Sequence, residues 1–220
     1  MKRLLGVLIL ALLQSCSASR KIVDKPIVFN EERNELTIQY LKDRYGLEQD
    51  SPNIVPKMIV LHWTAIPTFE GSYDAFYNEK IPSWREVVSM ASGLNVSSHF
   101  LVDQDGTIYS LMPETIMGRH VIGLNHCAIG VENVGGTKDT PLTKAQLKSN
   151  IWLVKYLAKK YNIEYVIGHH EYTLFENHEL WLEKDEDYRT KKTDPGDAFM
   201  AKVRKATNNF EFKPLPVKTN

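Results

Sequence analysis

The chain has 220 residues, of which 43% are apolar and 25% are charged, as in an ordinary globular protein with room for one domain and short extensions. Its 27 Lys and Arg residues balance 27 Asp and Glu residues, and the sequence contains no Lys/Arg run long enough for a phosphate-binding strip. This balance argues against a nucleic-acid partner.

The N-terminal residues 1–15 have the pattern of a targeting segment. Lys2 and Arg3 precede an apolar stretch that is too short to span a bilayer, and Ser15-Cys16 follows at once. This arrangement predicts a bacterial lipoprotein signal peptide, with Cys16 as the lipidated first residue of the mature chain. The alternative is an ordinary signal peptide cut near Ala18. We therefore expect a membrane partner through the lipid, and a location in the bacterial cell envelope, facing the periplasm from the inner or outer membrane.

Residues 16–29 are polar or mixed in composition, and we expect them to form a tether. Asn30 suits the N-cap of a helix and Gly46 suits its C′ position, so a helix and linker are expected over residues 30–50. The main domain is then expected over residues 51–205. Residues 206–220 contain Pro214 and Pro216 and are expected to form a weakly structured tail.

The main domain alternates strand and helix signals. An apolar run at 58–63 suits a strand buried on both faces, and residues 72–80 suit a short helix. Two β-rich runs at 96–102 and 107–111 flank an Asp-Gly turn, which predicts a hairpin. A strand at 128–134, a helix at 144–161 that begins with a Thr143/Gln146 capping box, and a strand at 165–168 follow. This order predicts an α/β fold: one domain with a central mixed sheet flanked by helices.

Two of the expected strands end in histidine, at His62 and His169, and a turn near the C-terminus presents Asp194. Two imidazoles and one carboxylate are a ligand set for catalytic zinc, with the fourth position left to water. Each histidine alone is more often structural, and a lone Asp-Pro-Gly is usually only a turn. The combination predicts a metal-dependent hydrolase with its zinc site at one end of the sheet.

Six short segments stand in a fixed order from about Pro56 to about Val203. They are Leu61-His62-Trp63-Thr64-Ala65, Ser97-Ser98-His99-Phe100-Leu101-Val102, Asp105-Gly106-Thr107-Ile108-Tyr109, Ala128-Ile129-Gly130-Val131-Glu132, Gly168-His169 and Lys192-Thr193-Asp194-Pro195-Gly196. In this order they resemble the zinc-dependent N-acetylmuramoyl-L-alanine amidases (amidase type 2) of the kind shared with peptidoglycan recognition proteins. The resemblance implies that residues 51–205 form an amidase domain.

The resemblance also implies a role for each matching residue. His62, His169 and Asp194 would bind Zn²⁺, Glu132 would transfer protons, and Lys192 would stabilise the oxyanion. The implied reaction is hydrolysis of the amide bond between N-acetylmuramic acid and L-alanine in peptidoglycan or muropeptides. A non-catalytic peptidoglycan-binding module of the same fold is the alternative, although no ligand is missing here.

Several neighbouring residues have less specific expectations. His120 and Asn125 match family positions that face the substrate cleft, so both are expected to contact substrate. The Gly-His pairing selects His169 over His170 as the ligand, and Glu171 is expected to orient a ligand histidine. The charge-rich segment 172–189 is either a loop or short helix that shapes the rim of the cleft or a solvated insertion, and the second is the default for such a loop. If Cys16 is lipidated, Cys127 has no disulfide partner, and we expect it to be a small buried residue.

Overall fold

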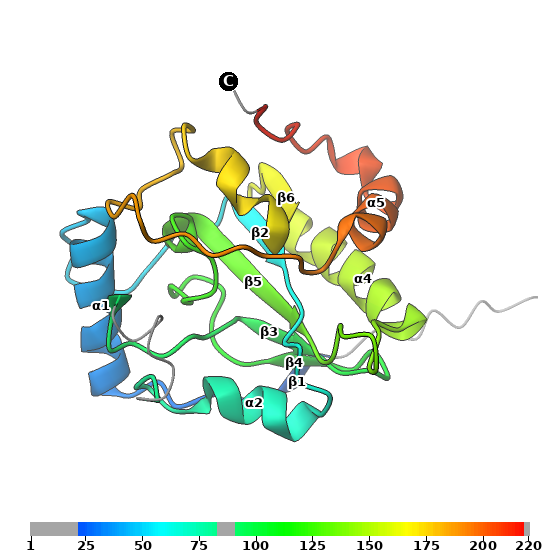
Figure 1. Cartoon of the computed structure of the whole chain (residues 1–220), viewed down its shortest axis with the longest axis horizontal. Helices are drawn as coiled ribbons and strands as arrows, with labels where there is room; N and C mark the ends of the chain where they lie inside the picture. Colours follow the sequence, from blue (N-terminus) through cyan, green and yellow to red (C-terminus); the bar gives the residue numbers. More distant parts are fainter. Residues whose placement is uncertain (1–21, 83–90, 218–220) are drawn as a thin grey trace, which may run out of the picture.

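The computed structural model of the chain describes residues 22–82 and 91–217. At its centre lies a six-stranded sheet with the order β1-β4-β3-β5-β2-β6 (Figure 1). The strands are β1 (Ile22–Asp24), β2 (Met58–Leu61), β3 (Phe100–Val102), β4 (Ile108–Ser110), β5 (Ala128–Asn133) and β6 (Tyr165–Gly168). The β3–β4 hairpin is antiparallel and the other neighbouring pairs are parallel. The predicted single α/β domain with a mixed sheet is confirmed.

Helices cover both faces of the sheet (Figure 1). They are α1 (Glu31–Tyr45), α2 (Phe69–Tyr77), α4 (Lys144–Lys160) and α5 (Asp197–Ala206), with short 3-10 turns η1 (Asn125–Cys127), η2 (His169–Phe175) and η3 (Asn208–Phe210). Helices α4 and α5 pack on one face, where Ile59 and Leu61 of β2 point, whereas Met58 and Val60 point into a second cluster beneath η2. None of the helices in the described ranges is both long and apolar enough to cross a bilayer.

Two predicted caps are confirmed and fix the ends of helices. The Asn30 side chain accepts a hydrogen bond from the Arg33 N–H, and Gly46 adopts the left-handed conformation that ends α1. Thr143 and Gln146 form the capping box of α4. The Gln146 side-chain amide also donates to the carbonyls of Val102 in β3 and of Val134 just after β5, so the start of α4 is bound to the sheet and to the loop that follows β5.

The prediction of a tether is wrong for the described residues 22–29. β1 pairs with β4 along the sheet edge, and Ile27 is buried. Within residues 30–50 the predicted helix is present as α1, and it packs on the domain, because Arg33 is buried and donates to the carbonyls of Phe76 and Tyr77 at the end of α2. A three-residue strand is too short to give a period-two pattern, which explains why composition alone suggested a tether.

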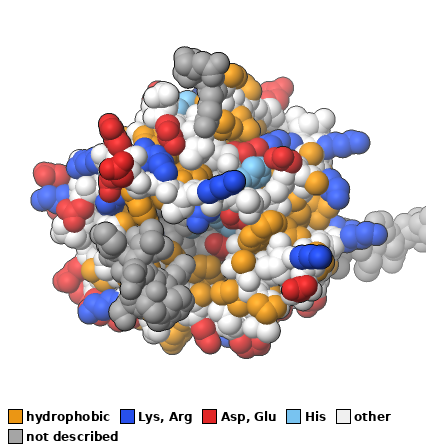
Figure 2. Space-filling view, in the orientation of Figure 1, with side chains coloured by type: hydrophobic (Ala, Val, Ile, Leu, Met, Phe, Trp, Pro, Cys, Tyr) orange, Lys and Arg blue, Asp and Glu red, His pale blue; other side chains and the backbone are white. Residues whose placement is uncertain are grey.

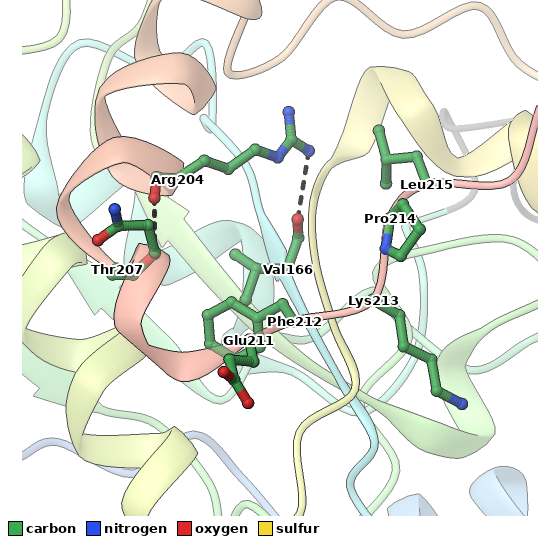
Figure 3. A pocket seen from close by; sticks show the side chains of 9 residues that line it. Val166, Arg204, Thr207, Glu211, Phe212, Lys213, Pro214 and Leu215 are labelled. Atoms are coloured by element: carbon green, nitrogen blue, oxygen red, sulfur yellow. Dashed lines mark hydrogen bonds between the residues drawn. The ribbon is translucent and has the colours of Figure 1, made fainter.

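The tail was predicted to be weakly structured, but its described part, residues 206–217, packs against the domain. α5 continues to Ala206, and the chain then runs beside β6, where the Lys213 N–H donates to the Glu164 carbonyl at 2.8 Å. The Arg204 guanidinium donates to the Val166 carbonyl at 3.2 Å, which Figure 3 shows as a dashed line. A cavity of about 510 Å³ lies between α5 and this tail. The tail and Arg204 therefore cover polar groups of an edge strand, which protects the edge from pairing with other chains.

The charge-rich segment 172–189 is partly docked, so the default expectation of a solvated insertion is wrong at Glu183, although residues 184–187 are exposed. The Glu183 side chain has no exposed surface and pairs with Arg44 of α1 at 2.7 Å. The Lys184 N–H donates to the Arg44 carbonyl at 3.1 Å. The segment 172–189 therefore packs against α1, and both are parts of the same domain.

Candidate metal centre

The sheet register brings three of the predicted residues to one edge. The last residue of β2 pairs with Val131 of β5 and with Gly168 of β6. His62, Glu132 and His169 are the next residues along these parallel strands, and they lie at the carboxyl edge of the sheet. Such edges are the usual binding sites of α/β folds.

The three predicted metal ligands converge at this edge. His62 Nδ1 lies 2.9 Å from His169 Nδ1, and the Asp194 Oδ2 lies 3.4 Å from the first nitrogen and 3.0 Å from the second. All three residues are buried. Ligands about 2.0–2.1 Å from a tetrahedral zinc are about 3.3 Å from one another. The donor set and its spacing therefore fit a zinc ion, and a three-residue set leaves a fourth position open.

The charge states of this group also suit a cation. Burial and the neighbouring His62 lower the pKa of His169 to about 3. Burial acts to raise the pKa of Asp194, but hydrogen bonds and charge from His169 and His62 outweigh it and hold the pKa well below its usual value. At neutral pH a neutral imidazole and a carboxylate are therefore available as ligands.

His120 lies behind His62 and fixes its orientation. The His120 Nε2 lies 3.2 Å from the Ala128 carbonyl, which can only accept, so Nε2 carries the hydrogen. Burial lowers the pKa of His120 well below its usual value, so its Nδ1 is an acceptor for the His62 Nε2–H at 3.0 Å. His62 Nδ1 is then left to face His169. A side chain at Gly130 would meet the His120 ring at 2.8 Å, so glycine makes room for it.

A cavity of about 340 Å³ opens beside the group, lined by Glu132, Lys192, Trp63 and residues of α2. Figure 2 shows a hollow near the middle of this face, with Lys or Arg side chains above it and a hydrophobic band below and to its right. A second, smaller cavity of about 90 Å³ adjoins it and is lined by Tyr40 and Tyr188, among other residues. α1 and the insertion thus contribute to the walls of the site.

The structure also shows the internal contacts of Asn125 and Glu171. Asn125 is buried, and its amide accepts from the His120 N–H and donates to the Tyr45 hydroxyl. Both contacts are internal, so a substrate contact stays a prediction for Asn125, as it does for His120. Glu171 contacts Arg204 and the Gly168 N–H, and these contacts do not orient His169. The sequence did not predict the contact of His120 with His62 or the position of Tyr188 in the cavity wall, because their neighbours in the site are far away along the chain.

The model of a family described as N-acetylmuramoyl-L-alanine amidase matches residues 50–197, more than half of the chain. The chain belongs to this family. The amidase family region covers all five predicted zinc and catalytic residues. It also includes the segment 172–189 and begins after the end of α1.

Individual relatives agree with this family membership. The endolysin of Escherichia phage T7 is 37% identical over 83 residues, which are 36% of this chain and 55% of the endolysin. Peptidoglycan recognition protein 3 of Mus musculus is 33% identical over 66 residues, which are 30% of this chain and 19% of that protein. The chain thus matches about half the length of the phage endolysin.

A solved structure supports the fold. The N-acetylmuramoyl-L-alanine amidase LysC from Clostridium intestinale URNW superposes with a TM-score of 0.52 at 24% identity, over 86% of this chain and 99% of LysC. At this identity the likeness shows the shared amidase family fold. The two N-terminal elements of this chain, β1 and α1, precede the region that the family model matches.

Proposed function

We propose that this chain is a zinc-dependent amidase that hydrolyses the bond between N-acetylmuramic acid and L-alanine in peptidoglycan or muropeptides. The observation that carries the proposal is the meeting of a buried His-His-Asp group with Glu132 and Lys192 around one cavity. The family membership supports the same reaction class.

His62, His169 and Asp194 would hold the ion through the three atoms that face one another. Zinc at this position supplies a Lewis acid for the amide carbonyl and an acidified water at neutral pH. His120 keeps His62 in the tautomer whose Nδ1 faces the group. Ligand histidines in zinc enzymes are commonly held by such a hydrogen bond from their second nitrogen.

Glu132 and Lys192 would act on the amide bond, through proton transfer and oxyanion stabilisation respectively. Glu132 lies on β5 and lines the cavity, where its carboxylate can take a proton from the attacking water and deliver it to the leaving amine of L-alanine. Lys192 lies two residues before Asp194 and lines the same cavity, so its ammonium can stabilise the carbonyl oxygen as negative charge develops.

The test is digestion of purified muropeptides with and without a chelator, with product masses read by mass spectrometry. We expect glycan free of peptide and a stem peptide with a new N-terminal alanine, and no product after chelation. His169→Ala should lose zinc and activity together, whereas Glu132→Ala should lose activity and keep zinc. An active Glu132→Ala protein would refute the assigned proton transfer.

The same experiment separates the enzyme from a peptidoglycan-binding module. A module would bind muropeptides in the presence of zinc without releasing products. The complete ligand group favours the enzyme, because a binding role alone does not require the open metal position.

We further propose that the protein is anchored in the bacterial cell envelope by lipid on Cys16 and acts there. This residue and the signal peptide of residues 1–15 lie outside the described residues, so the support is the sequence pattern alone. Cys16→Ser should abolish incorporation of labelled fatty acid and release the protein from the membrane fraction. Labelled Cys16→Ser protein would refute lipidation at this residue.

A further inference from the structure

The proposed ligands His169 and Asp194 come from two separate segments that must be held at a fixed distance. His169 begins η2, and Asp194 lies in the turn that leads into α5. His170, the residue after His169, binds this turn directly, and Glu171 binds α5. His170 contacts Asp194 and Asp197, and Glu171 pairs with Arg204 at 2.5 Å.

His170 makes three contacts with the second segment. Its backbone N–H donates to the Asp194 carbonyl at 2.9 Å, and its ring Nδ1 lies 2.9 Å from the same oxygen. Its ring Nε2 lies 2.9 Å from the Asp197 carboxylate at the start of α5. The imidazole therefore bridges the backbone of the ligand Asp194 and the first residue of the next helix.

The His170 ring packs in a space that exists because residue 168 is glycine. A side chain at position 168 would lie 2.7 Å from the His170 ring and 2.9 Å from Pro195. Glycine at this position lets the imidazole pack under the end of β6 and against the Asp194-Pro195 turn. Only 15% of the His170 side chain is exposed, so its orientation is set by packing as well as by hydrogen bonds.

His170, Glu171 and Asp197 are close enough to resemble a second metal group, but their ligand atoms are already used. The Glu171 carboxylate accepts from the Gly168 N–H at 2.7 Å and from both terminal nitrogens of Arg204. These hydrogen bonds join η2 to β6 and to α5.

We propose that His170 is a positioning residue: by bridging Asp194 and Asp197 it sets the distance between the Asp194 carboxylate and His169, and hence the affinity of the site for zinc. This inference rests on the proposed function in one respect, since it takes Asp194 as a zinc ligand. It adds a role for the histidine that the sequence set aside as the non-ligand of the His169-His170 pair.

The test compares zinc dissociation constants, measured by competition with a chromophoric chelator, for a set of full-length variants. His170→Ala should weaken zinc binding about 10- to 100-fold, the usual effect of losing a residue that orients a ligand. His170→Asn keeps a side-chain N–H near the position of Nδ1 and should restore most of the affinity. Asp197→Ala should give a smaller loss, and because this carboxylate is 96% exposed the variant is expected to fold.

The matched control is His178→Ala, since His178 is also a hydrogen-bonded histidine, bonded to the Tyr165 hydroxyl. It packs on Phe175, the last residue of η2, and makes no hydrogen bond or ring contact with His169 or Asp194. Its zinc affinity should equal that of the wild type. The melting temperatures of the zinc-free proteins separate positioning from folding. Equal zinc affinity in wild type, His170→Ala and Asp197→Ala, or equal losses in His170→Ala and His170→Asn, would overturn the inference.

Different results would refute the proposed function and this inference. A wild-type protein without zinc affinity, or an Asp194→Ala variant that binds zinc like wild type, overturns the assignment of the metal centre and this inference with it. A zinc-binding, active wild type whose affinity is insensitive to His170 overturns the inference alone.

Discussion

The ion pairs of Arg44 offer a test of how burial decides the value of a charge contact. Its guanidinium lies 2.7 Å from Glu183 and 3.3 Å from Asp185. The Glu183 side chain is 0% exposed, whereas that of Asp185 is 47% exposed. One cation thus serves a buried and a solvated carboxylate at similar distances.

Replacing Arg44 by alanine leaves the Glu183 carboxylate buried without its cation, and breaking a buried pair in this way costs about 3–5 kcal/mol. Asp185→Ala removes only a solvated partner and should cost about 0–1 kcal/mol. In the Arg44→Ala background, Glu183→Gln removes the uncompensated charge and should recover part of the loss. The glutamine oxygen can still accept from the Asp185 N–H, which bonds Glu183 at 3.0 Å.

The assay is urea unfolding at pH 7 with zinc present, followed by circular dichroism, for the three variants and wild type. The order of stability should be wild type, Asp185→Ala, Arg44→Ala/Glu183→Gln and Arg44→Ala. If Arg44→Ala is no less stable than Asp185→Ala, then burial of Glu183 does not control the value of the pair, and the docking of the insertion on α1 has another cause.

Three further outcomes are expected. Burial lowers the pKa of His99 to about 4. Between about pH 6.5 and pH 4, His99 is therefore protonated in the unfolded chain and neutral in the folded protein. Stability should therefore fall by about 2 kcal/mol from this group between pH 7 and pH 5, and a pH-independent urea midpoint in that range would contradict it. Thr143→Ala removes the α4 cap and should cost about 1 kcal/mol, whereas an unchanged midpoint would show that the capping box is dispensable. Zinc at 100 times its dissociation constant should stabilise the wild type by about 2.7 kcal/mol, and a similar gain in Asp194→Ala would argue against that ligand.

Buried strands were the part of the fold that the sequence predicted best. β2, β5 and β6 are nearly continuous apolar runs, which is typical of parallel strands covered on both faces, and each has a chemistry-bearing residue at or just beyond its end. The carboxyl ends of parallel strands lie at the same edge of a sheet. Once the register of β2, β5 and β6 is known, His62, Glu132 and His169 are therefore neighbours.

Other features depend on pairings that leave no local pattern. Arg44 and Glu183 are 139 positions apart, and His62 and His120 are 58 apart. A charge-rich stretch has the same composition whether it is solvated or docked, so composition could not decide between the two readings of the segment 172–189. The docking of α1 on the end of α2 depends on Arg33, a residue type that is seldom fully buried.

The short edge strand β1 limits how far the domain could lie from a membrane. Under the proposed lipidation, Cys16 precedes Ile22 by six positions, and a fully extended chain spans at most about 3.6 Å per residue. The lipid and the sheet edge would then be within about 20 Å of each other, less than half the span of a tether that ran to residue 29. Ile22, where β1 begins, would lie within this distance of the lipid, whereas β6 with its tail is at the opposite edge of the sheet. An enzyme held in this way would depend on substrate reaching the membrane surface.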